Sequence, residues 1–357
     1  MRILLSGAFN PAFEALPEYL AAALLRLGHE VHRFDHRGFL LPGRLRARSS
    51  RLARWDRGRL NERFLRQVRC FGIELALVNQ GMALGPDTIE RARREGARCV
   101  NWFSDFPAEF EAGLRAAPAY DAFYLGSSYA AARHREAGHG HAGWLPFACD
   151  PESHHPGAPR RSEAGAPAVV FVGSHYPERQ VLLRFLRGLP VGVWGPGWER
   201  ARDDAFVAPM VRGAALRPAQ WRLLYAGSRV ALNIHYGAFG PPEVSGDLAN
   251  TRAFEILACG AYQVANRQGD LLRLFRDGEH LATFSGGDEL RARVEEALRD
   301  EDRRRAIAER GRAAVLASHT YLHRARALLD PAFRGMALPS RAGAASTQPR
   351  AAGGSGR

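Results

Sequence analysis

The chain has 357 residues, of which 46% are hydrophobic and 24% charged, as in a globular protein long enough for two domains. Its net charge of +13 comes from 50 basic residues, all of them arginine, and favours an anionic partner: a phosphorylated substrate, nucleic acid or an anionic membrane face. The four cysteines have no C-x-x-C spacing, and no apolar run is long enough for a signal peptide or a membrane span. We therefore expect a cytoplasmic protein without a zinc site or a disulfide framework.

The first 40 residues predict a strand, a loop, a helix and a second strand. "RILLSG" is a short apolar run, "EALPEYLAAALLRLG" has helical spacing, and "HEVHRFD" alternates like a strand. Further strands are expected at 74–79, 97–103 and 121–127, with helical segments between them. This βα alternation predicts a parallel sheet with helices on its faces.

The second half of the chain repeats this organisation. Residues 154–167 are rich in Pro, Gly and Ala without apolar periodicity, which predicts a linker. The alternation restarts at 168–174 and continues into charged helices. We therefore predict the α/β class, with two Rossmann-like doubly wound domains at 1–153 and 168–336. The small polar residues 337–357 predict a disordered tail.

Residues 37–69 form the most basic segment, with eleven arginines against Asp56 and Glu62. Rough helical spacing makes part of it a basic amphipathic helix, whose apolar positions are Leu52, Trp55, Leu60, Phe64 and Val68. Residues 44–69 could contact an anionic membrane face peripherally. The alternative, a solvated helix packed on the sheet, is the one that we favour.

In open α/β sheets, ligands bind beyond the carboxyl ends of strands and near helix N-termini. Two expected strand ends and one helix start in the second domain meet this condition. The candidate binding residues there are Gly173, Ser174, Asn233, His235, Asn250, Thr251 and Arg252.

The stretch "GDLANTRAFEILACGA", residues 246–261, gives the sharpest argument. Asn250 or Thr251 can cap a helix whose N-terminal partial positive charge suits a diphosphate. Arg252 in the first turn opposes the helix dipole, which makes sense if a phosphate lies there. Glu255 could then accept hydrogen bonds from a ribose diol, and Asp247 could reach a sugar hydroxyl. The alternative is an exposed arginine and a glutamate that stabilises an ordinary helix start.

The segment "NTRAFEILACGAYQVANRQGDLLRLFRDGEH" resembles the donor-site signature of group 1 GT-B glycosyltransferases. Their usual acid pattern is E-x7-E, and this chain has the shorter acid first, as Asp247-x7-Glu255. Over residues 100–330 the chain more closely resembles the CgeB-type family. The matching pieces are "NWFSDFP", "LPFACDPESH", "FVGSHYPERQVLL", "VWGPGW", "SRVALNIHYG", "TRAFEILACG" and "SHTYLHRARALL".

The resemblance implies a GT-B fold, in which the two domains face each other across a cleft. It implies a nucleotide-diphosphate-sugar on the C-terminal domain and a hydroxyl acceptor (a glycan, a lipid-linked molecule or a protein) on the N-terminal domain. Glu255 would bind the ribose and Asp247 the sugar. Gly173 would admit the diphosphate, which Arg179 and Arg252 would neutralise. No metal-binding D-x-D motif is obvious, so neither a metal nor a cofactor is expected, and the resemblance favours retention of the anomeric configuration.

Two further residues are candidates for catalysis. Asp105, in "NWFSDFP", is the best candidate for a general base that deprotonates the acceptor, although a turn aspartate before proline is an alternative. His235 could contact the donor phosphate or sugar, or have a structural role.

Three other functions remain open from the sequence. They are an inactive GT-B-type protein that binds a nucleotide sugar, a hydrolysing epimerase on the same fold, and a basic nucleic-acid-binding protein. The last has no helix-turn-helix, zinc or RNP-type motif, so we expect no nucleic-acid partner.

Overall fold

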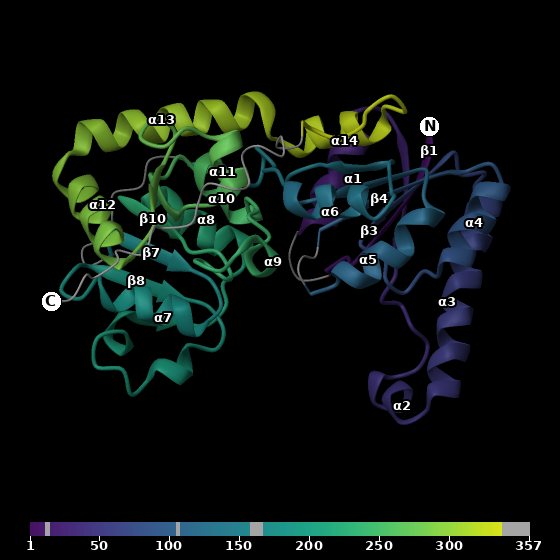
Figure 1. Ribbon diagram of the computed structural model, residues 1–357, viewed down its shortest axis with the longest axis horizontal. Coiled ribbons are helices and arrows are strands. Elements are labelled where there is room, and N and C mark those ends of the chain that lie inside the picture. The colour runs from purple at the N-terminus through teal and green to yellow at the C-terminus, as the bar shows by residue number, and fades with distance from the viewer. Residues whose placement is uncertain (11–14, 105–107, 158–166, 338–357) are drawn as a thin grey trace, which may run out of the picture.

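Two parallel six-stranded sheets, each flanked by helices, lie side by side in the described part of the chain (Figure 1). The computed structural model describes residues 1–10, 15–104, 108–157 and 167–337. The predicted pair of doubly wound α/β domains is confirmed. The predicted tail lies outside the described residues apart from Ala337, as does most of the predicted linker.

The N-terminal sheet has the strand order β2-β1-β3-β4-β5-β6, so the direction of chain progression reverses between β1 and β3. The strands are β1 (Arg2–Gly7), β2 (Glu30–Asp35), β3 (Leu75–Asn79), β4 (Arg98–Phe103), β5 (Ala122–Leu125) and β6 (Ala142–Trp144). The helices are α1 (Leu16–Arg26), α2 (Gly43–Arg48), α3 (Ser50–Cys70), α4 (Pro86–Arg94), α5 (Phe110–Ala116) and α6 (Ser128–Glu136), with a 3-10 turn at Ala117–Ala119.

The C-terminal sheet has the order β12-β11-β10-β7-β8-β9 and reverses between β7 and β10, which is the Rossmann arrangement. Its strands are β7 (Val169–Val172), β8 (Val191–Trp194), β9 (Val211–Gly213), β10 (Val230–Asn233), β11 (Gln263–Asn266) and β12 (Ala282–Phe284). Its helices are α7 (Pro177–Arg184), α8 (Pro218–Gly227), α9 (Pro242–Ser245), α10 (Thr251–Ala258), α11 (Gly269–Leu274), α12 (Gly287–Arg299) and α13 (Glu301–Ser318), with 3-10 turns at Trp198–Ala201 and Ala208–Met210.

After α13 the chain returns to the N-terminal domain, and α14 (Tyr321–Leu329) packs against α1 (Figure 1). The return continues to Met336, which pairs with Trp144 at the edge of the N-terminal sheet. Residues 321–336, which the sequence prediction assigned to the C-terminal domain, thus pack on the N-terminal domain. An amphipathic helix does not reveal which sheet it will cover, because that depends on contacts distant in sequence.

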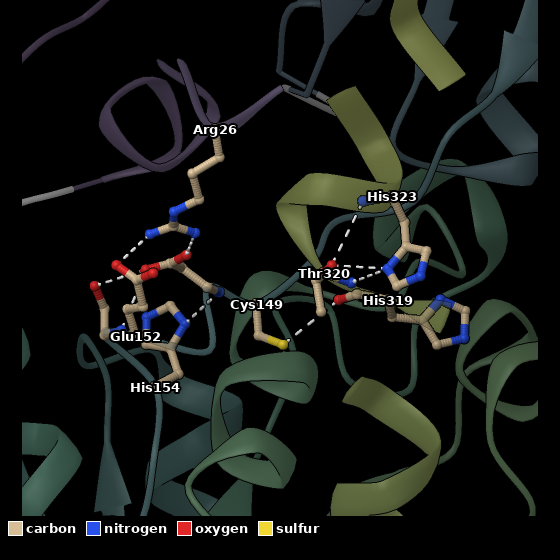
Figure 2. Close-up of polar contacts among 9 residues, drawn as sticks. Arg26, Cys149, Glu152, His154, His319, Thr320 and His323 are labelled. Carbon is tan, nitrogen blue, oxygen red and sulfur yellow. Dashed lines mark hydrogen bonds and ion pairs between the residues drawn. The ribbon is translucent and has the colours of Figure 1, made fainter. Parts of the chain in front are cut away.

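The two chain crossings between the domains are joined to each other (Figure 2). The amide of Cys149 donates to the carbonyl of His319 at 3.0 Å, and the amide of Tyr321 donates to the carbonyl of Cys149 at 2.9 Å. From α1, Arg26 forms ion pairs with Asp150, at 3.0 Å, and with Glu152. The two segments that cross between the domains are thus hydrogen-bonded to each other, and ion pairs link the first of them to α1.

One apolar cluster is shared by both domains. Tyr19 of α1, Phe254 and Leu257 of α10, and Tyr321 of α14 are all buried in it. This cluster therefore packs α10, the helix that carries predicted donor residues, against the N-terminal domain.

The basic segment 37–69 divides at Asp56. Leu60, Phe64 and Val68 of α3 are buried in the N-terminal core, as expected for a helix packed on the sheet. Leu52 and Trp55, which precede Asp56 in the same helix, are 43% and 52% exposed. None of the helices in the described ranges is both long and apolar enough to cross a membrane.

Gly311 lets α13 approach α10 closely. A Cβ at Gly311 would collide with the carbonyl oxygen of His280 and lie 2.8 Å from Leu257 of α10. We expect Gly311→Ala to lower the melting temperature despite the higher helix propensity of alanine. Gly58→Ala in α3, where a Cβ meets nothing within 4 Å, is the control and should leave stability unchanged or raise it by up to about 1 kcal/mol. Equal effects of both variants in thermal denaturation would contradict this packing argument.

Candidate functional site

The predicted donor residues lie at the carboxyl ends of β7 and β10, where the C-terminal sheet reverses. Gly173 and Ser174 follow β7, and His235 comes two residues after the end of β10. A Cβ at Gly173 would lie 2.9 Å from the Phe171 ring and 3.3 Å from a guanidinium nitrogen of Arg179. Gly173 is therefore needed for this packing, whether or not a diphosphate approaches it.

Arg179, in the first turn of α7, ties these two strand ends together. Its Nε donates to the carbonyl of Ile234 at 2.9 Å, and its Nη1 donates to the carbonyl of Ser174 at 2.8 Å. The side chain is buried and lies over the Tyr176 ring. Burial, and after it the positive charge of Arg252, lowers the pKa of Arg179 to about 10. A terminal nitrogen, Nη2, has no hydrogen-bond partner in the described ranges and remains available to a ligand.

Asn250 caps α10 and locks it to β10. Its Oδ1 accepts from the amide of Ala253 at 3.0 Å, as the sequence predicted for one of two capping candidates. The Asn250 and Asn233 side chains also donate to each other, at 2.9 and 3.0 Å. Thr251 is the first residue of α10 and is half-buried. The start of α10 is thus fixed relative to the sheet edge.

His235 is buried, and both of its ring nitrogens are engaged. Nε2 accepts from the amide of Asn250 at 3.4 Å, so the hydrogen-bond network assigns the proton to Nδ1, which donates to Oδ1 of Asn266 at 2.8 Å. Burial lowers the pKa of His235 to about 4, so the ring is neutral near pH 7. This arrangement connects β10, β11 and α10, and it leaves no ring nitrogen for substrate.

Arg252 and Glu255 lie on consecutive turns at the start of α10. The charge of Arg252 acts on Arg179, and its guanidinium also interacts with the buried hydroxyl of Tyr225. Burial raises the pKa of the half-buried Glu255 to about 7, and Arg252 offsets only part of that rise. No residue of the described ranges donates a hydrogen bond to the Glu255 carboxylate. The site therefore combines two arginines with a carboxylate that accepts no hydrogen bond from the described residues.

Asp247 lies in the loop before α10 but points to a different helix. Its carboxylate accepts from the amide of Gly269, the first residue of α11, and its carbonyl accepts from the amide of Asp270 at 2.9 Å. The backbone at Asp247 has φ 49°, a left-handed conformation that is uncommon outside glycine. Burial raises the pKa of this carboxyl group. The two acids eight residues apart are therefore held by separate elements, α11 and α10.

A clasp of three hydrogen bonds joins the domains beside Asp247. The Ser127 hydroxyl donates to the carbonyl of Gly246 at 2.5 Å, and the Ser128 amide donates to Asp270 at 2.8 Å. The Ser128 hydroxyl also contacts Asp270, which is fully buried. Asp270 thus caps α6 of the other domain.

Sequence reasoning did not identify the clasp residues. The only local signal was an acid three residues after "YQVANR" (262–267), a segment for which the sequence also predicts a strand, at a position where a helix can begin. Its partner lies 142 positions away in the chain, so spacing could not reveal it. Asp105, the predicted general base, lies outside the described residues.

Comparisons with known proteins support this fold. Residues 179–330 match the family model described as glycosyl transferase-like. The fold is similar to sucrose-phosphate synthase from Thermosynechococcus elongatus, with a TM-score of 0.68 and 14% identity over 91% of this chain and 96% of that one. It is also similar to Anabaena HepE in complex with UDP-glucose, with a TM-score of 0.62 and 13% identity over 91% and 97%. A search of curated sequences finds no match.

A third neighbour is alpha,alpha-trehalose 6-phosphate synthase from Burkholderia multivorans, with a TM-score of 0.60 and 13% identity over 91% of this chain and 96% of that one. These likenesses confirm the predicted GT-B fold. Together with the family match, they support a glycosyltransferase of that fold. Membership of the CgeB-type family stays a prediction.

The clasp predicts a pH-dependent stability. Burial raises the pKa of Asp270 to about 7, and the charge of the nearby Asp247 adds to this rise to a smaller extent. The two hydrogen bonds from Ser128 oppose it by lowering the pKa. A raised carboxyl pKa stabilises the fold fully below the unfolded value near 4, and this stabilisation is lost as pH rises from there to 7. Asp270→Asn removes the buried charge and keeps an acceptor for the Ser128 amide. We expect the variant to gain about 1–3 kcal/mol relative to the wild type between pH 5 and pH 8.

The measurement is denaturant unfolding at each pH. Asp302→Asn, at an exposed position of α13, is the control and should follow the wild type at every pH. A constant difference between Asp270→Asn and the wild type from pH 5 to 8 would show that Asp270 does not titrate in this window.

Proposed function

We propose that this protein transfers a sugar from a nucleoside-diphosphate donor to a hydroxyl acceptor. The observation that supports it most is the buried Arg179 at the sheet's reversal point, which is held by two carbonyls and whose pKa is lowered by burial and by the charge of Arg252. Neither guanidinium forms an ion pair with a described residue. A bound dianion would neutralise these two charges, and the diphosphate of a sugar nucleotide supplies one at a helix N-terminus.

The donor would lie across the start of α10. We assign the diphosphate to Arg252, the free nitrogen of Arg179 and the first amides of α10. Ser174 and Asn233 would shape the edges of this subsite. The Glu255 carboxylate is the acceptor suited to the ribose hydroxyls, because nothing else in the described ranges uses it. Anabaena HepE, whose structure contains UDP-glucose, makes UDP-glucose the first donor to test.

The same charges would assist departure of the nucleoside diphosphate. Negative charge develops on the leaving phosphate in the transition state, where fixed positive groups in a desolvated site stabilise it. Two arginines and a helix N-terminus can supply this without a metal, so we propose a metal-independent transfer. Retention of configuration stays a prediction, which the anomeric proton signals of the product would test.

The clasp would bring the acceptor side to the donor. It holds Gly246 and α11, and α11 in turn holds the Asp247 carboxylate that we propose for the transferred sugar. We assign His235 a positioning role, because its nitrogens are occupied. Asp105 stays the predicted general base on the N-terminal side.

Nucleotide affinity should depend on the ionisation of Glu255. Its pKa of about 7 means that the ionised fraction rises about tenfold between pH 6 and pH 8, and the affinity for UDP should rise with it. Glu255→Gln should weaken UDP binding about tenfold to a hundredfold at pH 8, because hydrogen bonds to a charged group are lost. Titration calorimetry measures both effects.

Any pH dependence of UDP affinity that remains in Glu255→Gln reports protonation of the UDP phosphate itself. Glu309→Gln, at an exposed position of α13, is the control and should bind as the wild type does. Wild-type affinity in Glu255→Gln at pH 8 would remove Glu255 from the donor site.

The proposed activity is tested with a panel of nucleotide sugars, by following release of the nucleoside diphosphate with and without sugar and lipid acceptors. We expect turnover that persists in EDTA and is lost in Glu255→Gln but not in Glu309→Gln. Tight binding across the panel without hydrolysis or transfer would instead favour the inactive nucleotide-sugar binding protein.

A further inference from the structure

We propose that residues 40–55, named here the α2–α3 tip, dock the protein on an anionic lipid surface. The tip comprises the end of the loop after β2, helix α2 and the first turns of α3. It projects beyond the rest of the N-terminal domain, at the lower edge of the view in Figure 1. Burial of α3 begins only at Asp56, so about 9 Å of the helix extends past its packed part.

The tip has a net positive charge. It carries five arginines and no acid, and the nearest acids in the sequence are Asp35 and Asp56. Asp56 is fully buried, and it lies 3.6 Å from Arg46, which is the innermost of the five. The other four, Arg44, Arg48, Arg51 and Arg54, are exposed.

Large apolar side chains share this surface. Leu40 and Leu45 are 56% and 39% exposed, and Leu52 and Trp55 lie three residues apart on one side of α3. On a helix face that contacts only water, exposing these four large apolar side chains would be unfavourable. Exposed leucine and tryptophan among arginines is the composition of an interfacial membrane anchor, in which the apolar groups enter the headgroup boundary and the arginines meet lipid phosphate.

The tip is held in shape from below. The Asp56 carboxylate accepts from the amides of Leu40 and Leu41 at 2.9 and 3.1 Å. The Arg46 Nε donates to the carbonyl of Leu41 at 3.2 Å, and its guanidinium stacks 3.8 Å from the Phe39 ring centroid. Buried polar contacts therefore fix an exposed apolar surface, so presenting it requires no ordering on contact.

Docking through the tip has a consequence for the acceptor, which depends on the proposed function. The tip follows the carboxyl end of β2, and the carboxyl ends of the parallel N-terminal strands share one edge of the sheet. That edge also carries Ser127, which closes on the donor domain. A protein docked by the tip would hold its acceptor edge near the lipid surface, which favours a lipid-linked acceptor.

The test is vesicle co-sedimentation of the full chain, with phosphatidylglycerol-containing vesicles and with pure phosphatidylcholine vesicles. We expect binding to the anionic vesicles only, weakening as salt rises. Arg48→Gln/Arg51→Gln/Arg54→Gln should weaken it about fivefold for each arginine removed. Leu52→Glu/Trp55→Glu should weaken it at least about tenfold.

Two matched variants on the C-terminal domain control for charge and for hydrophobicity. They are Arg202→Gln/Arg299→Gln/Arg305→Gln and Val181→Glu/Phe206→Glu, and both should sediment as the wild type does. UDP calorimetry on the tip variants separates this inference from the proposed function, because their UDP affinity should be unchanged. It also reports that they are folded.

Equal binding to neutral and anionic vesicles, or none to either, overturns the proposal. So does binding that is lost in the arginine variant, kept in Leu52→Glu/Trp55→Glu and competed by single-stranded RNA. That last pattern would identify a polyanion surface instead of a lipid surface.

Discussion

The candidate site depends on two arginines, Arg179 and Arg252, whose guanidinium groups form no ion pair with any residue that the structure describes. Arg179 is buried and fixed by two carbonyls, and Arg252 stands in the first turn of α10, where a cation opposes the helix dipole. Each placement is unfavourable for stability on its own. Both are maintained because Asn250 and Asn233 lock α10 to the sheet and a core shared by both domains packs its opposite face. The proposed function and the stability of the fold favour different residues here, as they do at many ligand sites.

The interface between the domains extends this constraint to the N-terminal domain. Asp247 binds α11, Asp270 of α11 caps α6 across the interface, and Ser127 holds the carbonyl beside Asp247. Opening the domains would expose Asp270 to water and free the Asp247 loop together. The contact between the domains and the position of the Asp247 loop are therefore coupled through one short helix, α11.

The sequence was sufficient where the signal is local. Apolar runs identified nine of the twelve strands in the two sheets, but not the three-residue strands β6, β9 and β12. The capping residue Asn250 and the first-turn cation Arg252 marked the start of α10 correctly. It was insufficient where the partner is distant: α14 covers the other domain, and Asp270 meets Ser128. His235 illustrates the same limit, because a strand-end histidine looked available until its two asparagine partners were placed. Roles for the site residues remain proposals.

Arg252→Gln tests the central claim most directly, through thermal melts with and without UDP. If Arg252 is unfavourable for the stability of the free protein and serves to bind a diphosphate, removing its charge should raise the melting temperature of the free protein. The same variant should lose most of the stabilisation that UDP gives the wild type. A variant that melts lower than the wild type when free, and is stabilised by UDP as much as the wild type, would contradict the account.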